Sequence, residues 1–165
     1  MIGAIVVLGL VTAERLAELV LARHNTARLL KRGAVEFAAG HYPLIVALHA
    51  VWLIGLWLIA WDRPLQWGWL ALFAVLQLLR VWVLATLGER WTTRIIVLPG
   101  VPLVKKGPYR FLSHPNYAVV VGEIAVLPLV FGLPWYAVAF SLMNAMILFL
   151  RISAESAALR GASDS

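Results

Sequence analysis

The stretch YAVVVGEIAVLPLVFGLPWYAVAFSLMNAMILFL, residues 117–150, contains two apolar segments separated by a Gly-Leu-Pro turn. The segments, 117–131 and 135–150, have about 15 and about 16 residues, so as helices each falls short of a hydrocarbon core of ~30 Å. A tight helical hairpin is therefore the economical prediction. Its second helix is expected to continue to about residue 155, which places Arg151 and Glu155, four residues apart, on one helix face.

Three more apolar segments precede this hairpin, at about residues 2–21, 44–60 and 67–87. The whole chain is 62% hydrophobic, has a mean hydropathy of +0.88 and contains eight tryptophans. A water-soluble domain of this length cannot bury so much apolar surface. We expect an all-α integral membrane protein with five transmembrane helices, forming a single domain over residues 1–165.

Basic residues mark the expected cytoplasmic side. Of the fourteen Lys and Arg, four lie between Arg23 and Arg32 and five between Arg90 and Arg110, whereas the alternate connections hold only Arg63. The positive-inside rule then places the N-terminus outside, and the C-terminus and the long loop between the third and fourth helices in the cytoplasm. Since this asymmetry explains the basic balance, no nucleic-acid partner is expected.

That cytoplasmic loop ends in GPYRFLSHPNY, residues 107–117. Its second proline can open a new helix, so His114 is expected just before a helix N-terminus, where free backbone N–H groups attract anions. Tyr109 and Tyr117 offer aromatic faces for an adenine ring or a sulfonium, and Glu155 could add a carboxylate. The alternative is an interfacial aromatic belt with a basic membrane-proximal loop.

Charged residues also fall within the apolar segments, at Glu14, Arg15, Glu18, Arg80 and Glu123. Charges at such depth are costly, so they are expected either to pair across helices or to line the site of a substrate headgroup. Glu123 is a candidate catalytic residue, with a structural pair to Arg80 as the alternative. The four histidines show no metal-ligand spacing, so no metal site is predicted, and the one in VALHAVW is interpreted as a hydrogen-bonded core residue.

The order of these motifs resembles a known family. PGVPLVKKGPYRFLSHPNY (99–117), followed by RISAE (151–155), is similar to the isoprenylcysteine carboxyl methyltransferase family, whose cofactor half carries an LVxxGPYxxxRHPxY loop, a helical hairpin and an RxxxEE ending. The N-terminal half looks like the bacterial branch of that family. The resemblance implies a methyltransferase of the bacterial cell membrane that uses S-adenosylmethionine, with a cofactor half over about residues 94–160.

The resemblance also implies site residues. Arg151 would face the methyl acceptor, and Arg94 matches a family cofactor contact by spacing only. Ser113 and Ser156 depart from the family pattern where an arginine and an acidic residue are usual, and the short C-terminus departs from longer relatives. The residues expected to line the cofactor are Val101, Pro102, Leu103, Val104, Tyr109, His114, Pro115, Asn116, Tyr117 and Glu155.

The methyl acceptor stays open between a carboxylate and a hydroxyl of a lipophilic molecule, either an isoprenoid or a long-chain polyketide-like compound. A carboxylate needs no base, whereas a phenol or enol must lose a proton, for which His114 and Glu123 are the available candidates. Two other classes remain. One is a membrane reductase whose nicotinamide cofactor is clamped by Lys105, Lys106 and Arg110, and the other is a non-enzymatic protein that binds membrane lipids.

Overall fold

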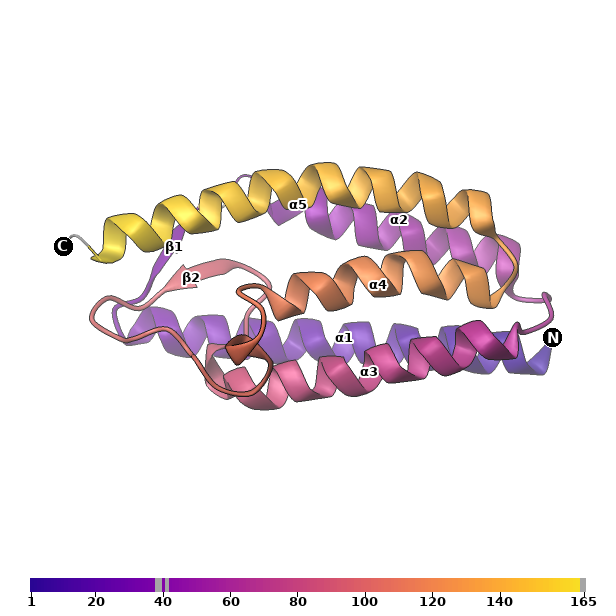
Figure 1. The fold of residues 1–165 in the computed structure, drawn as a ribbon, viewed down its shortest axis with the longest axis horizontal. Helices are drawn as coiled ribbons and strands as arrows, with labels where there is room; N and C mark the ends of the chain where they lie inside the picture. Colours follow the sequence, from indigo (N-terminus) through magenta and orange to yellow (C-terminus); the bar gives the residue numbers. More distant parts are fainter. Residues whose placement is uncertain (38–39, 41, 164–165) are drawn as a thin grey trace.

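The computed structural model describes residues 1–37, 40 and 42–163, with side chains described as far as Ser153. Within these described residues, five α-helices run along one long axis, and two short strands and two 3₁₀ turns accompany them (Figure 1). The elements are α1 (Ile2–Lys31), β1 (Val35–Phe37), α2 (Tyr42–Ala60), α3 (Trp67–Leu87), η2 (Gly88–Arg90), β2 (Ile95–Val97), η3 (Gly107–Arg110), α4 (Pro115–Val130) and α5 (Pro134–Ser163).

The connections separate to the two ends of the bundle. Figure 1 shows the N-terminus at the same end as the α2–α3 and α4–α5 turns, while the strands and the C-terminal end of α5 lie at the other end. The three-residue connection between α4 and α5 forms the tight hairpin that the apolar pattern predicted. The strands and the start of α4 therefore lie away from the N-terminal end of the bundle.

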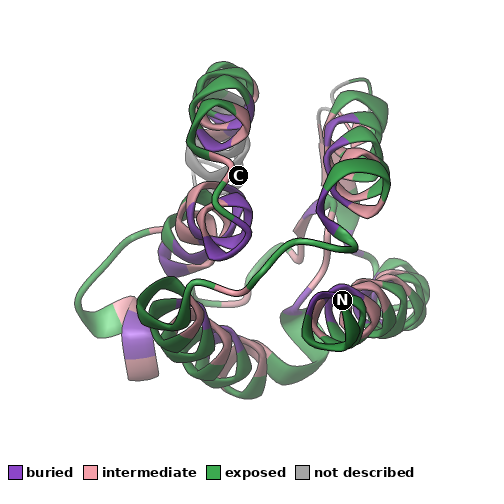
Figure 2. Cartoon of the chain, turned by 90° about the vertical axis from the view of Figure 1, so that its right-hand side faces the viewer, coloured by how far each residue is buried: buried purple, intermediate pink, exposed green. Residues whose placement is uncertain are grey.

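Three helices in the described part of the chain are long and apolar enough to cross a membrane: Tyr42–Ala60, Trp67–Arg90 and Pro134–Ser153. Exposed residues lie on the outward faces of the helices (Figure 2), and many large apolar side chains are among the exposed residues. The chain is thus an integral membrane protein. α4 is apolar but has only 16 residues, and α1 carries charges, so the count of five spans stays a prediction.

The first and last helices are longer than predicted. α1 runs to Lys31, past the predicted end at about residue 21, and α5 runs to Ser163, past about residue 155. The α1 extension is rich in residues that favour helix, and hydropathy does not detect such a polar continuation. Asn25, which is 2% exposed, secures it by donating hydrogen bonds to the backbone oxygens of Gly88 (3.1 Å) and Trp91 (2.8 Å).

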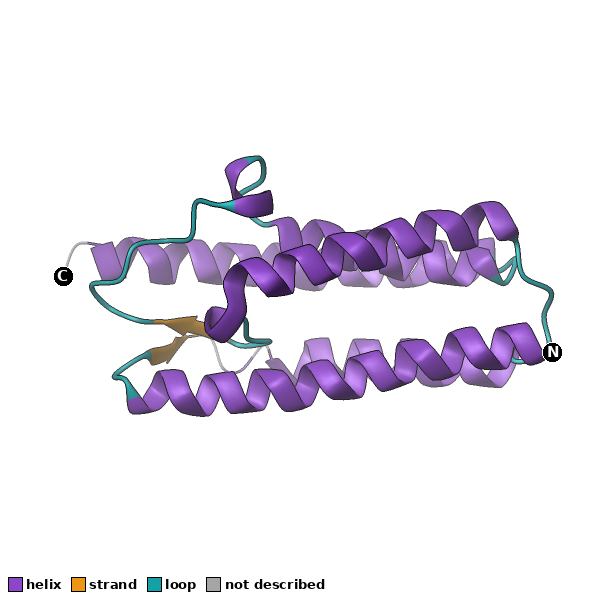
Figure 3. Ribbon diagram, turned by 90° about the horizontal axis from the view of Figure 1, so that it is seen from below, coloured by secondary structure: helices purple, strands orange, loops and turns teal. Residues whose placement is uncertain are grey.

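The predicted all-α class is confirmed, and one short antiparallel pair of strands accompanies the helices: β1 and β2, with Val35 opposite Val97 (Figure 3). Each strand has only three residues, too few to give an alternating pattern. Arg94 supports the pair by a bridge of 2.9 Å to Glu36, and its guanidinium lies 4.8 Å from the ring centroid of Tyr42. The two cytoplasmic loops predicted from the charge pattern are thus joined.

Candidate active site

A cavity of about 360 Å³ lies between α1, α2, α4 and α5. Its walls are mostly apolar, with Leu16 and Leu19 of α1, Ile45 and Leu53 of α2, and Leu148 of α5 among the lining residues. A volume of this size falls in the range of ~300–1,000 Å³ that is usual for small-molecule sites. The bundle therefore contains an apolar chamber large enough for an organic ligand.

The cavity opens sideways between α1 and α2. Leu16 and Ile54 both line it, and yet each is 59% exposed on the outer surface of the bundle. The border of the cavity is therefore formed by apolar side chains of both helices that are exposed on the bundle surface. A lipophilic molecule could enter from the bilayer without crossing a polar barrier.

Arg151 and Tyr117 form one polar end of the cavity. Arg151, 8% exposed, donates from Nε to the Tyr117 hydroxyl (2.9 Å) and from Nη2 to the backbone oxygen of Thr93 (2.6 Å). The Thr93 hydroxyl lies 3.2 Å from the hydroxyl of Tyr42 at the start of α2. Since all four residues line the cavity, three separate parts of the chain hold one guanidinium in its wall.

Four buried polar atoms on cavity-lining residues have no hydrogen-bond partner within the described part of the chain. They are Nε of Arg15, Oδ1 of Asn116 and the indole Nε1 atoms of Trp52 and Trp91. Buried donors and acceptors are normally satisfied, so orphaned ones in a cavity wall point to a ligand or water. A ligand that carries both donors and acceptors would match this set of atoms.

The N-terminus of α4 carries the other predicted residues of this region. Pro115 is the first residue of the helix, as predicted, and is buried. His114 is the N-cap residue, and its ring stacks on Tyr117 with centroids 5.3 Å apart. Tyr109 lies in η3 and packs against a separate apolar cluster that includes Val83 and Trp91.

The remaining predicted cofactor residues do not line the cavity. Val101, Pro102, Leu103 and Val104 lie in the irregular segment between β2 and η3, where the Pro102 backbone oxygen accepts a bond of 2.8 Å from Arg90 Nη1. Glu155 lies on α5, but its side chain is outside the described residues. The cavity therefore unites Asn116, Tyr117 and Arg151 of the predicted set.

Comparison with known proteins shows the family. The model of the isoprenylcysteine carboxyl methyltransferase family matches residues 69–161, which includes most of α3, all of α4 and most of α5. The chain belongs to the isoprenylcysteine carboxyl methyltransferase family. It is also 42% identical over 159 residues to an uncharacterised protein, YpbQ, of Bacillus subtilis (strain 168), a match that covers 93% of this chain and 94% of that protein. No solved structure matches the chain. The family is one of membrane methyltransferases.

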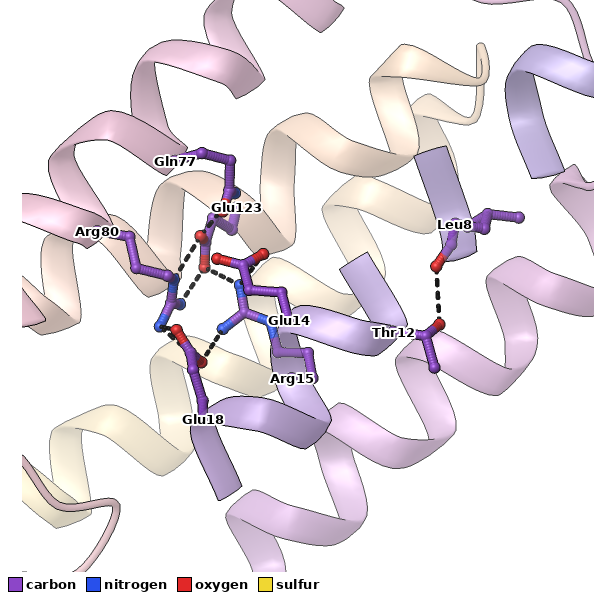
Figure 4. Close-up of polar contacts among 8 residues, drawn as sticks. All are labelled: Leu8, Thr12, Glu14, Arg15, Glu18, Gln77, Arg80 and Glu123. Atoms are coloured by element: carbon purple, nitrogen blue, oxygen red, sulfur yellow. Dashed lines mark hydrogen bonds and ion pairs between the residues drawn. The ribbon is translucent and has the colours of Figure 1, made fainter. Parts of the chain in front are cut away.

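In this family member, five charged side chains and Gln77 meet beside the cavity (Figure 4). Arg80, 3% exposed, lies between Glu18 and Glu123: its Nη1 is 3.0 Å from Glu18 Oε1, and its Nε is 2.7 Å from Glu123 Oε1. Arg15 bridges the same two carboxylates at 2.9 and 3.0 Å. The charges predicted to pair across helices do so, and they join α1, α3 and α4.

Glu123 is fully engaged in this charge network. Both of its oxygens accept bonds from Arg80, Oε1 also accepts from Gln77 (2.9 Å), and Oε2 lies 3.0 Å from Arg15. Glu123 does not line the cavity, whereas Arg15, Glu18 and Arg80 do. The pair with Arg80, left open as the alternative, is present, and the positive side chains of the network form part of the cavity wall.

His49 is the site residue that the sequence interpretation placed in the core. It lines the cavity, and its Nδ1 lies 2.8 Å from the backbone oxygen of Ile45. Since a carbonyl oxygen only accepts, Nδ1 is the donor, and in the neutral ring Nε2 then carries the lone pair. No local sequence signal distinguished this histidine, because its role depends on α2 packing across from α1 and α5.

Proposed function

We propose that this protein transfers a methyl group from S-adenosylmethionine to a carboxylate or hydroxyl of a lipophilic acceptor. We further propose that it lies in a bacterial cell membrane with its N-terminus outside, and that the reaction takes place at the cytoplasmic end of the helix bundle. The observation that carries the proposal is the cavity lined by Arg151, Tyr117 and Asn116, with exposed apolar side chains at its border between α1 and α2. Family membership supports the same reaction class.

The chain's own residues fit such a cofactor in part. The unpaired Oδ1 of Asn116 and Nε1 of Trp91 supply an acceptor and a donor of the kind that a nucleoside requires. The stacked rings of His114 and Tyr117 offer aromatic surface. S-adenosylmethionine, when bound, supplies a methyl group on a positively charged sulfur. From the family resemblance we also propose further residues that bind S-adenosylmethionine: Tyr109, Pro115, Glu155, Val101, Pro102, Leu103 and Val104.

Arg151 is assigned to the methyl acceptor. Its guanidinium is held by Tyr117 and the Thr93 backbone, so its direction is fixed before any acceptor arrives. Positioning of this kind is a large part of what a displacement reaction needs from an enzyme. A carboxylate acceptor would pair with the guanidinium directly, and a hydroxyl acceptor would be oriented by it.

Only a hydroxyl acceptor must lose its proton. Of the candidates, Glu123 has both oxygens occupied by Arg80, Arg15 and Gln77, so we assign it to the network rather than to the chemistry. His49 presents a basic nitrogen on the wall of the same cavity and is the better candidate for the proton acceptor.

The reductase alternative has less support. A nicotinamide dinucleotide carries a diphosphate, which needs cationic side chains to bind it. The cations that could clamp this diphosphate, Lys105, Lys106 and Arg110, are exposed and do not line the cavity. The cations that do line it, Arg15, Arg80 and Arg151, are held by protein carboxylates, a hydroxyl or a backbone oxygen.

Two measurements test the proposal. Purified protein in detergent should bind S-adenosylmethionine or its demethylated product in titration calorimetry, and it should gain thermal stability with ligand concentration. Lipid extracts incubated with the protein and a deuterated methyl donor should yield a product heavier by the label in mass spectrometry. Heat with a nicotinamide dinucleotide and none with either methyl-donor ligand would reverse the assignment.

A further inference from the structure

The segment from Lys105 to Leu112 combines exposed cations with exposed large apolar side chains. Phe111 is 75% exposed and Leu112 is 53% exposed, and Lys105, Lys106 and Arg110 are exposed beside them. Figure 3 shows that η3, which lies within this segment, projects from the side of the helix bundle. Single exposed apolar residues are ordinary, but two consecutive ones on a projecting turn are not.

The depth of this segment is set by its contacts with the end of α3. Gly107 has φ +57°, and a Cβ built on it would lie 2.5 Å from the Thr86 hydroxyl, so η3 lies directly on the last turn of that helix. Tyr109 packs with Leu84 and Leu87 in the same apolar cluster. These residues end the apolar helix Trp67–Arg90, so the segment lies where a membrane span ends.

The described residues place no carboxylate in an ion pair with the cations of this segment. The sequence contains no Asp or Glu between Glu89 and Glu123, and no ion pair to Lys105, Lys106 or Arg110 occurs within the described residues. Glu89 itself is engaged by Arg28 (3.0 Å). The segment is therefore a positively charged surface beside the end of a span, with apolar tips.

We propose that Lys105 to Leu112 is an interfacial anchor that binds the anionic lipids of the surrounding leaflet. Phe111 and Leu112 enter the boundary between headgroups and acyl chains, and the three cations contact lipid phosphates. Amphipathic basic surfaces bind membranes in this way, and each basic residue near an anionic surface adds about 1 kcal/mol. The charge complementarity favours lipid over a second copy of this chain, whose projecting segment is equally positive.

The anchor has a consequence for the candidate site. The segment leads through Ser113 directly into His114 and the N-terminus of α4, where Asn116 and Tyr117 line the cavity. Fixing Phe111 in the interface thus fixes the depth of that helix end. The proposal stands on the exposure and charge of the segment and does not depend on the proposed methyl transfer.

The absence of cysteine from the sequence allows a direct test. The variant Phe111→Cys, labelled with an NBD fluorophore, is placed in nanodiscs of phosphatidylcholine alone or with phosphatidylglycerol. We expect a blue-shifted emission that is quenched by lipids carrying a shallow spin label and is protected from iodide, with a larger shift when phosphatidylglycerol is present. Asp62→Cys, in the exposed α2–α3 turn, is the labelled control for the opposite leaflet.

A second variant separates the charges from the apolar tips. With Lys105, Lys106 and Arg110 all changed to glutamine, the labelled protein should lose the effect of phosphatidylglycerol. An NBD label at residue 111 that is quenched by iodide and untouched by the lipid label would overturn the anchor. Equal shifts in both lipid mixtures would overturn the binding of anionic headgroups. A shift that grows with protein copies per nanodisc would instead assign the surface to self-association.

Discussion

Arg151 of α5 donates a hydrogen bond of 2.9 Å to the hydroxyl of Tyr117 on α4, and its guanidinium lies 5.6 Å from the centroid of the same ring. The two residues are 34 positions apart. The helical hairpin brings them together because α4 and α5 run antiparallel, so that the start of α4 lies beside a later part of α5 (Figure 1). The aromatic and the cationic parts of the predicted motif thus form one unit in the cavity wall.

Changing Tyr117 to Phe removes this hydrogen bond and keeps the ring. Arg151 retains its bond to the Thr93 backbone, so its position becomes less defined rather than lost. We expect turnover to fall roughly tenfold, which corresponds to about 1.4 kcal/mol. Steady-state assays with the acceptor found by mass spectrometry measure this. Tyr136→Phe removes a hydroxyl that bonds to the Trp52 backbone at 2.8 Å and should leave turnover near that of the original protein.

The two ends of RISAE should have different roles. Changing Arg151 to Met should sharply lower turnover with cofactor affinity nearly intact, because the acceptor loses its positioning contact. Changing Glu155 to Gln should weaken cofactor binding by about 1.5–3 kcal/mol if a charged hydrogen bond is lost. Calorimetry and a turnover assay on both variants test the division. Equal losses of cofactor affinity would show that the pair acts together.

His49→Gln tests the proton acceptor. With a hydroxyl acceptor, turnover should drop by about 10²–10⁴-fold, the usual contribution of a general base, while cofactor binding is retained. With a carboxylate acceptor the same variant should retain turnover. His24→Gln, at an exposed position on α1, is the matched control. Unchanged turnover on a hydroxyl acceptor would remove His49 from the chemistry.

The charge network should respond more to one change than to two. Arg80→Leu leaves Glu18 and Glu123 buried with only Arg15 between them, and breaking such a pair typically costs about 3–5 kcal/mol. Adding Glu123→Leu should recover part of this loss. Thermal unfolding followed by tryptophan fluorescence compares the variants. Arg28→Leu, which breaks an exposed pair with Glu89, should cost about 0–1 kcal/mol, and a double variant less stable than the single one contradicts the network's role.

Orientation can be tested in intact cells. Single cysteines at Asp62 and Pro99 lie in exposed positions at opposite ends of the bundle. The positive-inside rule predicts that an impermeant maleimide labels the cysteine at residue 62 and not the one at residue 99. The reverse pattern would place the candidate site outside the cell, away from the cytoplasmic supply of methyl donor.

The sequence alone determined the main helical elements. The helix predicted at residues 67–87 is confirmed, and α2 and α4 begin within two residues of their predicted starts. Hydropathy finds such segments because a membrane-spanning helix forms its backbone hydrogen bonds within one continuous apolar segment. The signal in the sequence is therefore local and contiguous. The GPYRFLSHPNY loop and the RISAE ending were sufficient to indicate the family, because each motif is also a short contiguous stretch of sequence.

Only the tertiary structure decided which residues meet. β1 pairs with β2, and Arg80 contacts both Glu18 and Glu123, although these partners are 43 to 62 positions apart in the sequence. His49 lies in the cavity wall only because helices from different parts of the chain pack around it. A residue's type and neighbours in sequence do not encode its partner on another helix, because helix rotation and depth are set by packing. The motif therefore predicted Arg151 and Tyr117 as site residues, whereas their contact, and the cavity whose wall they share, exist only in the folded bundle.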